Sequence, residues 1–258
     1  MKLRVAALLA SVLFCASSGA QAGTILVSGD VNIGNGIDGS ASAPIGNNGV
    51  FFRNVLGAGT SVLFQTGFSV GSAADAYTSI ATLYLGLPGV TETTITTAPS
   101  AAQLTGVSLF LSALPLTPYS AADLSVLASY LASGGTVFFL GDNNSVADLI
   151  TADNNINAAL GALGSSVSLA LNDLDVGFQT AVGGQILANA LTVGVNSFVY
   201  AAVSGVAGGT ALFNTVEGTP FVAVTTTQTR SVPEPGSLAF IVAGLLGLGF
   251  AHRRRGRR

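Results

Sequence analysis

Short apolar runs recur along the first two thirds of the chain, and polar stretches separate them. The runs have five or six residues each and are rich in β-branched and aromatic side chains: Thr24–Ser28, Ser61–Gln65, Val107–Leu111, Thr136–Leu140 and Ser166–Leu171. Continuous apolar runs of this length are typical of strands that are covered on both faces. The pattern therefore predicts a buried sheet.

Two segments between these runs carry helical patterns. In the first, Ser120 and Asp123 have the spacing of a capping box, and an apolar helix face follows, made of Leu124, Leu127, Ala128 and Leu131. Gly134-Gly135 ends this helix directly before the next strand. In the second, Ser145 and Asp148 have the same spacing, and the apolar face consists of Ile156, Ala159, Leu160 and Leu163.

This order of elements is typical of a βαβ unit: a strand, a capped helix, a glycine pair and another strand. We therefore predict an α/β fold with a mainly parallel sheet sandwiched by helices. The last third differs, because Phe198–Val203, Thr210–Phe213 and Phe221–Thr225 are separated by Gly-rich turns with little room for helices. These segments are expected to form extra hairpins on the sheet edge.

The charges are segregated along the 258 residues. Between Gly23 and Arg230 the only cations are Arg53 and Arg230, against eleven acids, so this body carries a net charge of −9. Such a body has no basic face for nucleic acid. The single cysteine, Cys15, and the single histidine, His252, lie in the terminal segments. Disulfides, Cys or His nucleophile–base systems and Cys/His zinc sites are therefore excluded from the body, and no cofactor is expected.

The N-terminus has the three parts of an export signal. Lys2 and Arg4 supply positive charge, Val5–Ala16 is mostly apolar, and Ala20 and Ala22 supply the small side chains that signal peptidase accommodates. Residues 1–22 are thus predicted to be a signal peptide. This order of charges disfavours a buried N-terminal helix, and the bulky Phe14 disfavours lipidation of Cys15.

The C-terminus is the most specific part of the sequence. Pro233-Glu234-Pro235 is stiff and non-helical, because both prolines fix φ and lack an N–H. Residues 237–251 form an apolar run that is predicted to be a single transmembrane helix. The anchor on its cytoplasmic side is an arginine cluster: Arg253, Arg254, Arg255, Arg257 and Arg258.

This tripartite tail, residues 232–258, resembles the PEP-CTERM sorting signal. The resemblance implies an exported protein of a Gram-negative bacterium that makes exopolysaccharide. It also implies an exosortase, a membrane-embedded cysteine protease, that recognises the motif and removes the tail; an uncut membrane anchor is the alternative. The expected partners are signal peptidase, the exosortase, the membrane and exopolysaccharide. The expected locations are the inner membrane first, then the envelope surface or the extracellular matrix.

The body, residues 23–226, is joined to this tail by a linker, residues 227–231. It resembles the glutamine-amidotransferase-like, or flavodoxin-like, group in three segments: Val107–Leu111, Gly134–Asp142 and Asn189–Val195. In amidotransferases the turn after the Gly-Gly strand carries the nucleophilic cysteine. Here that turn is Gly141-Asp142-Asn143-Asn144, with no cysteine and no downstream histidine in the body. The resemblance therefore implies the fold without the activity.

The same turn is the candidate ligand site of the body. Open α/β sheets place ligands at the carboxyl ends of their strands, where Asp142-Asn143-Asn144 is expected to lie. A plain helix cap, involving Asp148, is the structural alternative.

Three weaker motifs have ordinary loops as their alternative. Gly34, Gly36 and Gly39 match a dinucleotide fingerprint, but Pro44 follows where a helix is needed. Asp30, Asn32 and Asp38 resemble an irregular calcium loop that lacks its final glutamate. Asp173 and Asp175 share one face of an expected strand and could serve glycoside hydrolysis, but no tryptophan accompanies them.

These features favour a non-catalytic exported protein with a binding or structural α/β module. An extracytoplasmic hydrolase that uses carboxylates and a self-associating matrix subunit are the two alternatives.

The first prediction concerns the N-terminus. Cleavage after Ala22 should give a secreted form that begins at Gly23, because small residues precede this bond at the two positions that signal peptidase reads. N-terminal sequencing of the exported protein measures this directly. Exported protein that still began at Met1 would contradict the prediction.

Overall fold

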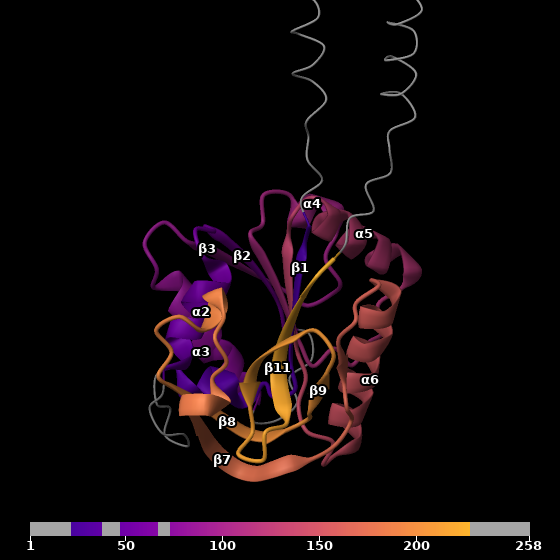
Figure 1. Cartoon of the computed structure of the whole chain (residues 1–258). Helices are drawn as coiled ribbons and strands as arrows, with labels where there is room; N and C mark the ends of the chain where they lie inside the picture. Colours follow the sequence, from indigo (N-terminus) through magenta and orange to yellow (C-terminus); the bar gives the residue numbers. More distant parts are fainter. Residues whose placement is uncertain (1–21, 38–46, 67–72, 228–258) are drawn as a thin grey trace, which may run out of the picture. The chain divides into compact units, whose positions relative to one another are not determined.

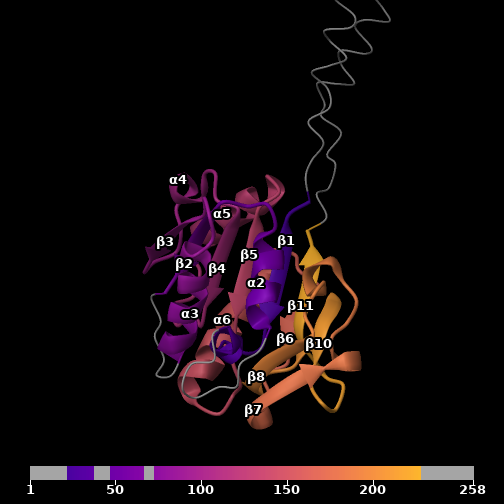
Figure 2. The ribbon, with the colours of Figure 1, turned by 90° about the vertical axis from the view of Figure 1, so that its left-hand side faces the viewer.

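A seven-stranded mixed sheet forms the centre of the domain. The computed structural model describes residues 22–37, 47–66 and 73–227. The central sheet has the order β10-β11-β1-β5-β4-β2-β3, which Figure 2 shows from one edge to the other. Its strands are β1 (Thr24–Ser28), β2 (Ser61–Gln65), β3 (Thr91–Ile95), β4 (Leu109–Ala113), β5 (Thr136–Leu140), β10 (Thr210–Asn214) and β11 (Pro220–Thr226).

The first five strands are parallel, and the last two form an antiparallel hairpin at one end of the sheet. Strands β1, β4 and β5 are almost wholly buried because helices cover both faces. A parallel sheet covered in this way needs apolar residues on both faces, which explains the continuous apolar runs. The expected α/β fold with a mostly parallel sheet and a C-terminal hairpin is confirmed.

Helices from different parts of the chain cover the two faces. Helices α2 (Asn48–Leu56) and α3 (Ala73–Leu85) pack on one face, through Phe51, Phe52 and Tyr84. Helices α4 (Ala101–Leu104), α5 (Ala121–Ala132) and α6 (Ala147–Ala162) cover the other face, through Leu127 and Ile156. Figure 1 shows the two layers on either side of the sheet.

The order of the five parallel strands is a rearranged flavodoxin-like order. Read from β3, it is β3-β2-β4-β5-β1. The flavodoxin-like order 2-1-3-4-5 is obtained only if β2 is counted as the first strand and β1 as the fifth. The N-terminal strand thus occupies the place of a last strand. The simple flavodoxin-like connectivity expected from the sequence is therefore not the one observed.

A two-stranded ribbon crosses the carboxyl ends of the parallel strands. It consists of β7 (Leu174–Val182) and β8 (Ser197–Val203), which pair antiparallel in a sheet of their own. In Figure 1 it lies beneath the end of β1. The sequence placed the β8 segment in a hairpin on the central sheet, and that prediction is wrong. The short strands β6 (Ser168–Leu169) and β9 (Val206–Ala207) form a third, separate pair.

Three 3-10 helices complete the described residues: η1 (Asn32–Gly36), η2 (Gly183–Gln185) and η3 (Ala190–Thr192). The fingerprint glycines Gly34 and Gly36 lie in η1, so this segment does not open an α-helix. In η3 the Asn189 side chain accepts from the Leu191 N–H at 3.0 Å, which caps the turn that the Asn189–Val195 segment suggested.

The two capping boxes predicted from the sequence have different outcomes. At α5, Ser120 Oγ accepts from the Asp123 N–H at 3.2 Å and Asp123 accepts from the Ser120 N–H at 2.9 Å, which confirms the first box. At α6, the N-cap is Val146 and its side chain makes no cap hydrogen bond, so the box at Ser145 is wrong.

Both described ends of the domain leave from one edge of the sheet. β1 begins and β11 ends as antiparallel neighbours, with Thr24 opposite Thr226. Beyond them the Thr227 N–H donates to the Gly23 carbonyl at 2.8 Å. This edge holds the amino ends of the parallel strands and lies opposite the β7–β8 ribbon.

The described residues contain no helix that is long and apolar enough to cross a membrane. The predicted span, residues 237–251, and all of the predicted signal peptide except Ala22 lie outside the described residues.

Candidate functional site

The turn Gly141–Asn144 lies at the carboxyl end of β5, as predicted, but it is more enclosed than a ligand turn should be. Asp142 is 5% exposed and Asn143 is 7% exposed. Asp142 Oδ1 accepts from the Asn143 N–H at 2.7 Å and from Asn143 Nδ2 at 3.0 Å. Asn143 Oδ1 in turn accepts from the Ser145 N–H at 2.8 Å. Asp142 Oδ1 and the Asn143 side chain are therefore committed to hydrogen bonds within the turn and with Ser145, whereas Asn144 Nδ2 donates to the Asn172 carbonyl at 3.4 Å.

A cluster of buried carboxyl groups surrounds Asp142. The Asp142 N–H donates to Asp153 Oδ1 at 3.1 Å, and Asn32 Nδ2 contacts Asp142 Oδ2 at 3.5 Å. Asp30 follows β1, the strand beside β5, and is fully buried. We call Asp30, Asp142 and Asp153 the carboxyl cluster. Its members come from three separate segments that meet where β1 and β5 end.

Asp30 serves the fold and not a calcium loop. Its Oδ1 accepts from the Asn32 N–H at 2.6 Å, and its Oδ2 accepts from the Ala201 N–H on β8 at 2.7 Å. Both oxygens are thus used, and the ribbon covers them. Asp38, the other acid of the suspected loop, lies outside the described residues, and so does Gly39 of the fingerprint. Within the described residues, no three His, Cys, Asp or Glu side chains are placed to hold a metal ion.

Asp173 and Asp175 do not form the pair that a strand would give. The chain takes a positive φ of 52° at Asp175, and the register of β7 shifts just after it. Asp175 Oδ2 accepts from the Tyr200 hydroxyl at 2.7 Å. Asp173 instead lies near enough to Asp142 for its charge to raise the pKa of Asp142. The shared strand face that a glycosidase-type pair would need is therefore not present, and the ordinary turn that was its alternative fits the structure better.

The carboxyl cluster has unusual titration behaviour. Burial raises the pKa of Asp142 to about 7, although hydrogen bonds from Asn143 oppose the shift. Burial also raises the pKa of Asp153 to about 8, and the charge of Asp142 adds to this effect. Burial and the charge of Asp142 hold the pKa of Asp30 well above its usual range. Desolvation disfavours the ionised form in each case.

Buried polar atoms without a hydrogen-bond partner in the described part of the chain occur both at the cluster and in the turn. They include Asp153 Oδ2, the Tyr77 hydroxyl and Asn144 Oδ1. Tyr77, on α3, is buried, and the negative charge of Asp142 contributes to raising its pKa. The sequence did not single out Asp153, although its signal was present: an acid stands between Leu149 and Ile156 on the apolar face of α6.

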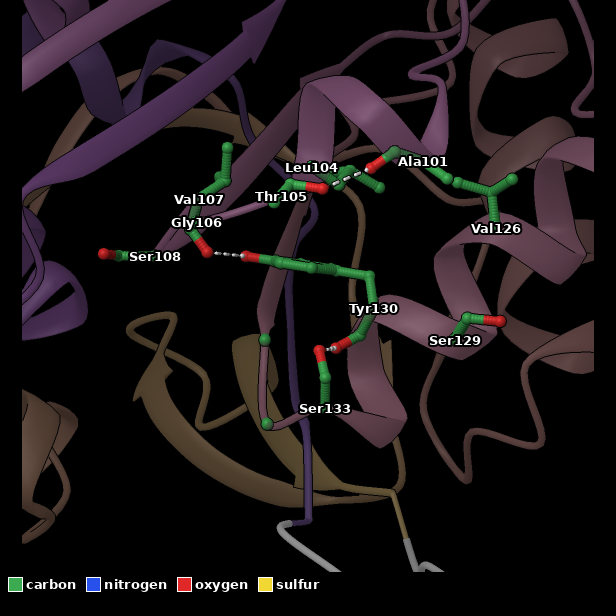
Figure 3. A pocket seen from close by; sticks show the side chains of 12 residues that line it. Ala101, Leu104, Thr105, Gly106, Val107, Ser108, Val126, Ser129, Tyr130 and Ser133 are labelled. Atoms are coloured by element: carbon green, nitrogen blue, oxygen red, sulfur yellow. Dashed lines mark hydrogen bonds between the residues drawn. The ribbon is translucent and has the colours of Figure 1, made fainter.

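One cavity lies elsewhere, at the amino ends of β4 and β5. It has a volume of about 510 Å³ and is lined by α4, the turn after it, the end of α5 and Gly134-Gly135. Figure 3 shows Tyr130 across its wall, where the Tyr130 hydroxyl donates to the Val107 carbonyl at 3.3 Å. No acidic or basic side chain lines it. This cavity shares no residue with the Gly141–Asn144 turn.

A second cavity, of about 310 Å³, lies at the carboxyl ends of β2, β3 and β4. Gln65 and Tyr119 are in its wall. The sequence analysis missed it because its residues come from three loops that only the strand order brings together.

Comparisons with known proteins identify the tail. Residues 231–255 match the PEP-CTERM protein-sorting motif, which includes the predicted Pro233-Glu234-Pro235 and the first three arginines of the cluster. The chain is therefore an exported protein that is sorted by an exosortase at a membrane-associated step. This class is defined by its tail, and the match covers only that part of the chain.

The body is not assigned by these comparisons. No curated protein matches the chain. Among solved structures, the mmIFT52 N-terminal domain is similar at 17% identity and a TM-score of 0.40, over 60% of this chain and 72% of that one. A likeness at this level carries no conclusion about the body. The comparisons with known proteins do not support the resemblance of the body to glutamine amidotransferases.

The second prediction concerns the pH dependence of stability. Unfolded carboxyl groups titrate near pH 4, and Asp142 and Asp153 titrate at about 7 and about 8 in the folded protein. The folded state therefore holds more protons than the unfolded chain between about pH 4 and pH 8. The free energy of unfolding should fall as pH rises through this range.

Thermal unfolding at several pH values and constant ionic strength tests this. The melting temperature should be lower at pH 8 than at pH 5, and Asp153→Asn should flatten the slope. Asp148→Asn, which changes an exposed acid on the same helix, is the matched control and should leave the slope as it is. A melting temperature that rises from pH 5 to pH 8 would rule out the protonated cluster.

Proposed function

We propose that this chain is a non-catalytic protein of the cell envelope or the exopolysaccharide matrix, and that its α/β domain is a binding or structural module. The observation that carries the proposal is the match of residues 231–255 to the sorting motif. The motif directs an exported chain to an exosortase, and the proposal adds the destination and the role of the body. In this scheme signal peptidase removes residues 1–22 and the exosortase removes the tail, which releases the domain from the membrane.

The chemistry of the Gly141–Asn144 turn supports a non-catalytic role. Acyl transfer needs a nucleophile of adequate strength and a base that activates it. Here the turn offers one carboxylate and two amides, and the body has neither cysteine nor histidine. Asp142 is 5% exposed and its Oδ1 accepts two hydrogen bonds from Asn143. A group held in this way is a support for the turn and a poor reactant.

One observation favours a carboxylate-dependent hydrolase as the second candidate. Burial brings the pKa of Asp142 to about 7, and a general acid works best when its pKa is close to the pH of the medium. Asp153 and Asp30 lie in the same cluster, and two carboxyl groups can divide acid and base roles. The candidate stands below the first because Asp30 is fully buried and both its oxygens accept backbone N–H groups.

Strand β3 favours self-association as a third candidate. It forms one edge of the central sheet, and most of its residues are exposed threonines. An open strand edge can pair with the edge of a second copy. Glu92 lies on this edge and opposes such pairing by charge. A size in solution that grows with concentration would favour this candidate over an isolated binding module.

The third prediction tests the sorting role. Replacement of Pro233-Glu234-Pro235 by three alanines should leave export intact and hold the protein in the inner membrane, because the signal peptide and the apolar run are unchanged. Cell fractionation and immunoblotting measure the distribution. The double variant Gln228→Ala, Thr229→Ala changes the neighbouring linker and should be sorted normally. If the alanine variant reaches the medium or matrix as efficiently as the natural chain, the motif has no sorting function.

The fourth prediction tests the absence of catalysis. The exported protein should show no turnover of amide, ester or glycoside substrates, since the turn lacks an activated nucleophile. Chromogenic substrates of each class provide the assay, with Asp142→Ala and the exposed Asp148→Ala as a matched pair. Hydrolysis that Asp142→Ala abolishes and Asp148→Ala preserves would replace the binding module with the carboxylate hydrolase.

A further inference from the structure

We propose that the cavity at the carboxyl ends of β2, β3 and β4 binds a neutral sugar residue. This inference rests on the proposed binding function of the domain and names its site and ligand class. The cavity has a volume of about 310 Å³ and is lined by Gln65, Thr96, Thr97, Ala98, Thr117, Pro118, Tyr119 and Asp123.

The position of this cavity follows from the order of the strands in the central sheet. After β2 the chain passes to α3 on one face of the sheet. After β3 and β4 it passes to α4 and α5 on the opposite face. Because the helices that follow β2 and β4 lie on opposite faces, the carboxyl ends of these two strands form a topological switch point, which is where open α/β sheets bind ligands.

The other switch point of this kind is closed. It lies between β1 and β5, whose loops also leave toward opposite faces. There the Asp30 carboxylate accepts the Ala201 N–H of the β7–β8 ribbon, and Asp30 is fully buried. A ligand would have to displace the ribbon to enter. The switch point beside β2, in contrast, has a cavity.

A buried amide supplies hydrogen-bond donors to the cavity. Gln65 ends β2 and is 2% exposed. Its Oε1 accepts from the Tyr119 hydroxyl at 2.6 Å, and Ser112 Oγ lies 2.7 Å from the same hydroxyl. The Tyr119 hydroxyl thus fixes the orientation of the Gln65 amide. In the proposed complex, Gln65 Nε2 is the donor to the ligand.

A single carboxylate supplies acceptors on the other side. Asp123 Oδ2 accepts from the Ser120 N–H at 2.9 Å and from Ser120 Oγ at 2.7 Å, in the capping box of α5. Its Oδ1 accepts no hydrogen bond from a described residue. The box fixes the Asp123 side chain in the wall of the cavity. Amide donors and a fixed carboxylate together match the hydroxyl groups of a sugar, which both donate and accept.

The charge of the wall selects among ligand classes. Asp123 repels anions, and no lysine or arginine lines the cavity to attract them. A calcium ion takes six to eight oxygen ligands, usually with several carboxylates, whereas one carboxylate is present here. The exposed Thr96, Thr97 and Thr117 add neutral hydroxyls, and the ring of Tyr119 and Pro118 add apolar surface. A neutral polyhydroxyl ligand fits this combination best.

The experiment uses the exported full chain, extracted in a detergent without a sugar headgroup. Saturation-transfer NMR is recorded with the methyl glycosides of glucose, galactose, mannose and N-acetylglucosamine, and with glucuronate as the anionic comparison. At least one neutral glycoside should bind with a millimolar dissociation constant, as a single small ligand in an open cavity does. Glucuronate should bind more weakly than glucose.

Two cavity variants locate the binding. Asp123→Asn keeps the capping acceptor and removes the charge, and it should weaken binding about tenfold, the usual effect of losing one charged hydrogen bond. Gln65→Met removes the amide donors and should act in the same direction, with its folding checked by thermal unfolding. Asp148→Asn makes the same change in the first turn of α6, outside the cavity, and should have no effect.

Each negative result has a definite meaning. If no neutral glycoside binds at concentrations far above millimolar, or if both cavity variants bind as well as the natural chain, the sugar site is wrong. Those results would leave the sorting and non-catalytic assignments intact. Turnover in the hydrolase assays would instead overturn the proposed function, whatever the cavity binds.

Discussion

The arrangement of the domain depends on the attachment of the β7–β8 ribbon over the end of β1. Two buried side chains make this attachment. Asp30 accepts the Ala201 N–H, and Asn48 bonds both to the Val199 N–H at 2.8 Å and to the Val199 carbonyl at 2.7 Å. The Ser204 N–H donates a further hydrogen bond to the Gly29 carbonyl at 2.8 Å. A Cβ atom at Gly29 would clash with the Ser204 carbonyl oxygen. Buried groups of this kind stabilise the fold only when they remain paired.

The scarcity of cations in the body is consistent with buried carboxyl groups that accept hydrogen bonds from N–H groups and not from arginine or lysine. The body has eleven acids and two arginines, of which Arg53 is exposed. Buried carboxyl groups usually keep their charge beside a cation, which lowers the pKa. Within the described residues the carboxyl cluster has no such partner, and burial raises the pKa of each member. Asp30 and Asp142 instead take backbone and amide N–H groups as donors, and Asp153 accepts from the Asp142 N–H. Hydrogen bonds from neutral N–H groups, rather than ion pairs, thereby satisfy these buried carboxyl oxygens.

The sequence predicted the parts of the fold that depend on local pattern. β1, β2 and β5 have the predicted bounds because buried parallel strands leave a continuous apolar run. β3, with the sequence Thr-Glu-Thr-Thr-Ile, was missed because it lies on a polar edge. The ribbon was misplaced because the partner of Asp30 on β8 lies 171 positions away. The Gly141–Asn144 turn was placed correctly on a strand end, but its enclosure depends on Asp153 and on long-range packing that no spacing rule contains.

The position of β1 places the two described ends of the domain away from the proposed ligand cavity. Because β1 takes the place of a fifth strand, it pairs with both β5 and β11, and Gly23 and Thr227 become neighbours at the amino edge of the sheet. In the proposed scheme, signal peptidase and the exosortase act on the segments that continue from these two residues. The cavity beside Gln65 opens at the carboxyl edge, at the other end of the same strands. In the proposed scheme, a ligand at the carboxyl edge would lie at the opposite end of the strands from Gly23 and Thr227.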